Sequence, residues 1–174
     1  MPKPSRPLML FAAFLAVSLG IELTGWLVLP SWSIAASAVS PARQQQVWDW
    51  YVDTRDWPHW DHLVDEVEST GPFRSGTTGV SRSGGLTMRS ALVDVRGPDA
   101  YTEVLHVPLA TLTATHALTP AQEGTRIEHG MTVEGPAAWV LFVLKRREMQ
   151  DGMNDAIHRL AMHAADGLPT RRLP

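Results

Sequence analysis

The feature that most constrains this chain is a long amphipathic segment near its C-terminal end. A Gly-Pro pair at residues 135–136 precedes the segment, and Gly167 and Pro169 follow it, which is typical of a helix that begins after proline and ends at glycine. A helix over residues 136–166 would be about 45 Å long at about 1.5 Å per residue. Its apolar positions are three, four or seven residues apart and form one stripe: Trp139, Phe142, Met149, Met153, Ile157, Leu160 and Ala164. The sequence therefore predicts one long helix with one buried face, and Gly152 in its middle indicates a bend.

Short segments of alternating apolar and polar residues occupy much of the chain before this helix. Five of them predict β-strands: Ser31 to Ser40, Leu86 to Arg96, Tyr101 to Val107, Ala110 to Leu118 and Thr125 to Glu134. After the first strand, Ser40 and Pro41 predict the cap and the first residue of a helix, which the Trp57-Pro58 pair ends. This order of elements predicts an α+β fold, in which a curved antiparallel β-sheet wraps around the long C-terminal α-helix.

Length, charge and composition exclude several classes of protein. The 174 residues fit one domain, and 44% hydrophobic with 19% charged residues exclude a disordered chain. A net charge of −3 disfavours nucleic-acid binding, and the absence of cysteine excludes disulfides and thiolate chemistry. The sequence contains no G-x-S-x-G, phosphate-loop or dinucleotide motif. His59 and His62, with Asp61 between them, could suggest a metal site, but the sequence shows no clear set of further ligands to complete it. We therefore expect neither a metal nor a cofactor.

Residues 1–30 form a separate hydrophobic N-terminal segment. Residues 8–29 are long enough for a membrane helix, and Lys3 and Arg6 precede them, as in an anchor or a signal peptide. Glu22 argues against a spanning helix. A cleavage site of the A-x-A type would fall inside the first strand, which argues against a cleaved signal. A membrane anchor, a signal peptide and an extension from a misassigned start codon therefore remain alternatives. We expect membrane association through this segment, and otherwise a cytoplasmic protein.

Two later motifs resemble those of a known superfamily. The run Trp57-Pro58-His59-Trp60 and the turn Gly71-Pro72-Phe73 with Gly76-Thr77 resemble the W-P-x-W segment and the G-x-F-x-x-G-T turn of the START-like helix-grip (SRPBCC) proteins. The polyketide cyclase/dehydrase-like branch is the most similar, and the resemblance covers about Ser31 to Ala165. It implies a helix-grip domain over residues 31–167, followed by a tail at 168–174, with an elongated cavity for an apolar molecule. Because these motifs are structural, the resemblance assigns no catalytic residue.

The alternation of two strands points a pair of histidines into the interior. His129 shares a face with Ile127, Met131 and Val133, and His116 shares one with other apolar side chains. A hairpin centred on Gln122 and Glu123 sets four inward pairs opposite each other: Leu118 and Ile127, His116 and His129, Ala114 and Met131, Leu112 and Val133. Opposed Cβ atoms are about 4.5–5.5 Å apart, so at least one imidazole should stay neutral near neutral pH.

Neighbouring strands add further candidates. The apolar positions of Tyr101 to Val107 place Glu103 inward, whereas Leu86 to Arg96 allows two phases, one with Arg89 inward and one with Met88 inward. The stripe of the long helix contributes the remaining side chains. The predicted ligand contacts are Arg89, Tyr101, Glu103, Leu112, His116, His129, Met131, Phe142, Met149 and Met153.

Three functions fit these residues. The first is a protein that binds or carries a hydrophobic or amphipathic small molecule of lipid or polyketide type. The second is a cyclase or dehydratase in which His116 or His129 acts as general base and Tyr101 or Arg89 stabilises an enolate. The third is a protein-binding module whose interior is filled by its own side chains. The sequence does not indicate an oligomeric state.

Overall fold

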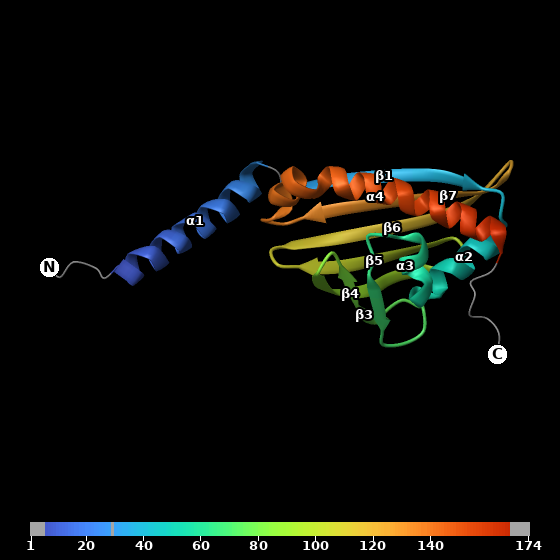
Figure 1. The fold of residues 1–174 in the computed structure, drawn as a ribbon, viewed down its shortest axis with the longest axis horizontal. Helices are drawn as coiled ribbons and strands as arrows, with labels where there is room; N and C mark the ends of the chain where they lie inside the picture. The colour runs from blue at the N-terminus through green and yellow to red at the C-terminus, as the bar shows by residue number, and fades with distance from the viewer. Residues whose placement is uncertain (1–5, 29, 168–174) are drawn as a thin grey trace.

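The computed structural model describes residues 6–28 and 30–167. Helix α1 (Arg6–Val28) projects from the end of the domain at which the first strand begins (Figure 1). The remaining elements follow in the order β1 (Ser31–Ser40), α2 (Gln44–Val52), η1 (Thr54–Asp56), α3 (Trp57–Trp60), β2 (Glu66–Ser69), β3 (Thr78–Ser83), β4 (Leu86–Arg96), β5 (Ala100–Val107), β6 (Ala110–Ala121), β7 (Gly124–Glu134) and α4 (Ala138–Asp166). The predicted tail at 168–174, Pro169 and Lys3 lie outside the described residues.

Seven antiparallel strands form one sheet in the order β1-β7-β6-β5-β4-β3-β2. Helix α4 lies across one face of this sheet and packs mainly on β1, with α2 and α3 beside its C-terminal half (Figure 1). The predicted α+β architecture, a sheet with a long C-terminal helix on it, is therefore confirmed.

No helix among residues 6–28 and 30–167 has the length and hydropathy needed to cross a membrane.

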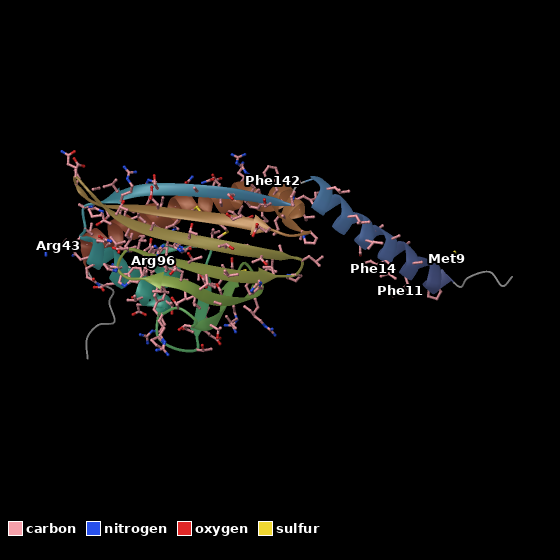
Figure 2. All side chains as sticks on the ribbon, turned by 180° about the vertical axis from the view of Figure 1, so that it is seen from behind. Met9, Phe11, Phe14, Arg43, Arg96 and Phe142 are labelled. Carbon is pink, nitrogen blue, oxygen red and sulfur yellow. The ribbon has the colours of Figure 1, made fainter. Side chains whose placement is uncertain are left out.

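Helix α4 buries most of its predicted stripe. Leu160, Ile157 and Met153 are buried, whereas Phe142 is 38% exposed and packs edge-on against Trp32 near the end from which α1 projects (Figure 2). Helix α4 continues without interruption through Gly152. Gly152 permits a close contact, because a Cβ atom there would lie 2.7 Å from the side chain of Leu63 in the loop after α3.

In the N-terminal part of the domain, the predicted start and end of the helix after the first strand are both wrong. Helix α2 begins at Gln44 rather than at Pro41, because the Ser40 hydroxyl is not a helix cap and instead donates a hydrogen bond to the Ala161 carbonyl at 2.7 Å. Pro58 does not end this helix: it lies in the first turn of α3, where a proline without an N–H is tolerated. Strands β2 and β3 were not predicted.

A β-bulge in β4 explains why its alternation allowed two phases. The register with β5 shifts between Leu92 and Asp94, so one extra residue lies at Val93. Before the bulge Met88 and Leu92 point inward, and after it Val95 does. Arg89 is consequently exposed on the outer face, and its predicted place among the ligand contacts is wrong.

Candidate functional site

The β6–β7 hairpin has the predicted register. His116 lies opposite His129, and the other three predicted pairs also match: Leu118 with Ile127, Ala114 with Met131 and Leu112 with Val133. The two imidazole rings are 4.4 Å apart between centroids and meet edge to face. His129 is 6% exposed, and Nδ1 of His116 is shielded from solvent. His116 is half-buried as a residue and His129 is buried, so the rings form one pair beneath the helices with their facing atoms shielded from solvent.

Both histidines are neutral at neutral pH. Burial lowers the pKa of His129 to about 3. Burial, together with the neighbouring His129 ring, lowers the pKa of His116 well below its usual value. Desolvation disfavours the imidazolium form, and a backbone hydrogen bond with Tyr101 opposes this effect at His116 only in part. Each ring can thus accept one hydrogen bond and donate another.

Three aromatic side chains complete this polar cluster. Tyr51 of α2 shares a hydrogen bond with His129, with 2.7 Å between Oη and Nε2. Tyr101 of β5 stacks on His116 with centroids 4.0 Å apart and ring planes at 5°. Trp60 of α3 contacts both Tyr51 and His129. We call Tyr51, Trp60, Tyr101, His116 and His129 the ring cluster.

Several polar atoms in this region have no hydrogen-bond partner within the described part of the chain. They are Nδ1 of His116, Oη of Tyr101, Nε1 of Trp60 and Oδ2 of Asp56. Most buried polar atoms in proteins are paired, because an unpaired one costs about 1–3 kcal/mol. The ring cluster therefore offers donors and acceptors that the protein itself does not use.

Glu103 points inward, as predicted, two residues along β5 from Tyr101 of the ring cluster. It is 6% exposed, and its carboxyl receives a hydrogen bond from Ser90. Burial raises the pKa of Glu103 to about 7, Ser90 opposes this rise, and the charge of Asp61 adds to it. Burial likewise raises the pKa of Asp61 to about 6. Near neutral pH the interior can thus gain or lose negative charge.

The remaining predicted contacts, except Phe142, belong to a second apolar cluster toward the N-terminal end of α4. It includes Leu112 and Met153, which are buried, and Met131 and Met149, which are half-buried. This cluster extends the interior from the ring cluster along the sheet. Of the predicted contacts on α4, Phe142 alone is exposed.

The expected elongated cavity does not lie open around the histidine pair. The side chains of the ring cluster pack with centroids 4.0–6.2 Å apart and fill this end of the interior. An open hollow of about 560 Å³ lies instead on the outer face of the sheet around Gly130. A much smaller pocket reaches Glu103 from between η1 and β3. Entry of a large molecule would require side chains of the ring cluster to move.

Sequence reasoning missed Tyr51 and Trp60 as members of the site. Trp60 appears in the sequence only as part of the W-P-x-W run, and no motif singles out Tyr51. Helical spacing indicates the face on which a side chain lies but not the strand it meets. Within the described residues no group of three metal-ligating side chains occurs, so His59, Asp61 and His62 do not come together with further ligands.

A family described as "Polyketide cyclase / dehydrase and lipid transport" matches residues 31–165 of the chain. No curated protein sequence matches. Among solved structures, a hypothetical protein from Helicobacter pylori is 12% identical, with 77% of this chain and 87% of that chain covered and a TM-score of 0.65. Ara h 8.0201 is 12% identical, with 79% and 99% covered and a TM-score of 0.59. The di-domain ARO/CYC BexL from the BE-7585A biosynthetic pathway is 15% identical, with 82% and 51% covered and a TM-score of 0.58. At these identities the likeness shows the fold.

Proposed function

Because the chain belongs to the polyketide cyclase/dehydrase and lipid transport family, we propose that it binds a small amphipathic molecule between the sheet and α4. In this proposal the protein acts as a carrier or binding protein. The polar end of the molecule would meet the ring cluster, and its apolar part would lie along the second apolar cluster.

The observation that carries this proposal is the set of unpartnered polar atoms in the ring cluster. Nδ1 of His116, Oη of Tyr101 and Nε1 of Trp60 lie among apolar side chains without a partner in the described residues. A hydroxyl or carbonyl group of a ligand would satisfy them. Met131 and Met149 support the same conclusion, since flexible methionine side chains suit a wall that adapts to a bound molecule.

Binding would need α3 and the loop after it to move, since the ring cluster is closely packed. Leu63 of this loop rests on Gly152, where the helix has no side chain to hold it. We propose that this contact opens when the ligand enters. The gap left by Leu63 would then lead to Trp60 and the histidine pair.

Native mass spectrometry of the protein purified from its own host tests this function. We expect a bound species of one mass per protein, released by lipid extraction, and a weaker complex for Tyr101→Phe combined with His116→Gln. The matched control is His106→Gln, an exposed residue on the outer face of the sheet. Protein that carries no small molecule, and takes up none from a lipid extract of the host, would support the protein-binding module instead.

A second candidate is a cyclase or dehydratase, favoured by the different hydrogen bonding of the two histidines. Tyr51 occupies Nε2 of His129, whereas Nδ1 of His116 is unpartnered and neutral at neutral pH. His116 could therefore remove a proton next to a carbonyl group, and the free Oη of Tyr101 could donate to the enolate oxygen. Loss of turnover with retained binding in His116→Gln, once a ligand is known, would separate the enzyme from the carrier.

We also propose that α1 attaches the protein to a lipid surface. Phe11 and Phe14 are 60% and 67% exposed, and Figure 2 shows both, with Met9, along the projecting helix. Exposed apolar surface of this extent is typical of an interaction site. The full chain should sediment with phosphatidylcholine vesicles, and a chain that begins at Ser31 should not. Equal sedimentation of the two would contradict this proposal.

A further inference from the structure

A small pocket opens beside Glu103, where η1 and α3 meet the sheet. Its wall includes Trp57, Thr77 and Ser90. The volume is about 20 Å³, which is room for about one group of the size of a water molecule. Glu103 and Ser90 are 6% and 8% exposed, so the carboxyl group belongs to the interior rather than to the surface.

The charges around this pocket are unbalanced. Every lysine and arginine side chain between residues 31 and 167 is exposed or half-buried. In that range the ion pairs of these side chains involve other acids, not Glu103. Asp61 brings a second carboxyl group, whose charge acts on both Glu103 and Tyr101. A buried carboxylate is stable only with a partner, so this pocket favours a positively charged group.

Aromatic side chains add to this preference. Trp57 lines the pocket and stacks on Tyr101, with ring centroids 6.2 Å apart and planes at 30°. Aromatic faces attract cations through the negative charge above the ring. The carboxylate of Glu103 and the ring of Trp57, both in the wall of the pocket, together suit an organic cation.

We propose that the molecule bound by this protein carries a primary ammonium group, which pairs with Glu103 in this pocket beside the ring cluster, while its apolar part lies along the second apolar cluster. The proposal rests on the function proposed above and specifies the class of ligand as a primary amine. The size of the pocket favours –NH₃⁺ over a trimethylammonium group. Since a bound ammonium stabilises the carboxylate, amine binding should strengthen as pH rises from about 6 to about 8, where an alkyl ammonium still keeps its proton.

Three matched probes test this inference by calorimetry on the full chain: 2-phenylethylamine, 2-phenylethanol and phenethyltrimethylammonium. At pH 8 we expect the primary amine to bind about tenfold or more tightly than the alcohol, because a charged hydrogen bond is stronger than a neutral one. This preference should disappear in Glu103→Gln, which keeps the size of the side chain. It should persist in Glu123→Gln, the same change at an exposed turn.

A second measurement does not depend on the variant. In the wild-type protein with ¹³C-labelled glutamate, the amine should lower the pKa of the Glu103 carboxyl group, and the alcohol should not. Equal binding of amine and alcohol would overturn the inference and leave the proposed function standing. Binding of none of the three probes would also overturn it, while the copurified ligand found by native mass spectrometry would decide the proposed function separately. Tighter binding of the trimethylammonium probe would show that the pocket does not select a primary amine.

Discussion

Replacing His129 with glutamine should change how the stability of this protein depends on pH. Glutamine is close in size to histidine, does not titrate, and its amide oxygen can accept the hydrogen bond of Tyr51. Because burial lowers the pKa of His129, the unfolded chain binds the proton more tightly than the folded one. Protonation therefore favours unfolding. The loss of stability begins as pH falls through the unfolded value of 6.5 and ends at the folded value of about 3.

The size of this effect follows from the two pKa values. Between pH 8 and pH 5, His129 alone lowers the free energy of unfolding by about 2 kcal/mol, and the full loss below pH 3 is about 5 kcal/mol. His116 adds a further loss of the same sign, part of which comes from the His129 ring itself. Between pH 8 and pH 5, the free energy of unfolding of the variant should therefore fall by at least about 2 kcal/mol less than that of the wild type.

The measurement has to be a difference between two proteins. Burial raises the pKa of Glu103 and of Asp61, so both groups make the protein more stable as pH falls and partly hide the effect of the histidines. Urea unfolding of wild type and His129→Gln, followed by the fluorescence of the seven tryptophans, cancels these common contributions. His106→Gln, at an exposed position, is the matched control.

A difference that stays constant within about 0.5 kcal/mol from pH 8 to pH 5 would refute the reasoning, because it would mean that His129 titrates normally in the folded protein. NMR titration of the two rings gives an independent answer. We expect His129 to stay neutral above pH 5, and His116 to become charged only well below its usual pKa of 6.5. Two ordinary titrations near pH 6.5 would show that the pair is accessible to water.

Other positions give further predictions. Leu160→Ala should lower the free energy of unfolding by about 2–5 kcal/mol, because Leu160 is fully buried, whereas Met162→Ala, at a side chain that is 60% exposed, should change it by less than about 0.5 kcal/mol; equal losses in urea unfolding would contradict the assignment of the buried face. Glu103→Gln should raise the free energy of unfolding by up to about 3 kcal/mol at pH 8 and by less than about 1 kcal/mol at pH 5, since the folded carboxyl ionises only near pH 7; a gain that is independent of pH would contradict this. A chain that begins at Ser31 should keep a cooperative thermal transition within about 2 °C of the full chain, because α1 projects from the domain, and a molten or aggregated product would count against that independence.

The sequence predicted the β6–β7 hairpin down to its register because two independent patterns agreed. Each strand alternates strictly, and the turn between them is short enough to leave one register that pairs every inward residue with another. Helix α4 was equally predictable from the sequence, since proline and glycine mark its ends and one apolar stripe covers its length. The local sequence pattern was sufficient wherever the bounds, the buried face or the register depended on one helix or one hairpin alone.

The parts that the sequence did not predict depend on contacts between elements. Strands β2 and β3 are short and largely polar, and β2 forms the edge of the sheet, so they carry little alternation. The bulge at Val93 shifts which residues of β4 point inward. The apolar positions before and after the bulge therefore predict opposite inward faces for the strand. Tyr51 and Trp60 reach the histidines from α2 and α3, and no spacing along the chain indicates such a meeting.

The interior of this protein is less stable than an apolar interior of the same volume would be. Protonation of the histidine pair lowers the free energy of unfolding as pH falls, and ionisation of Glu103 and Asp61 lowers it as pH rises. These groups therefore destabilise the folded protein on both the acidic and the basic side of its most stable pH. Unpartnered polar atoms on Tyr101 and His116 add a cost that does not depend on pH. Apolar residues at these positions would remove all of these losses while leaving the sheet and α4 able to pack. An interior that keeps titratable and unpartnered groups together beneath α2 and α3 is suited to a molecule with matching polar groups. This combination is the reason we propose binding rather than a purely structural core.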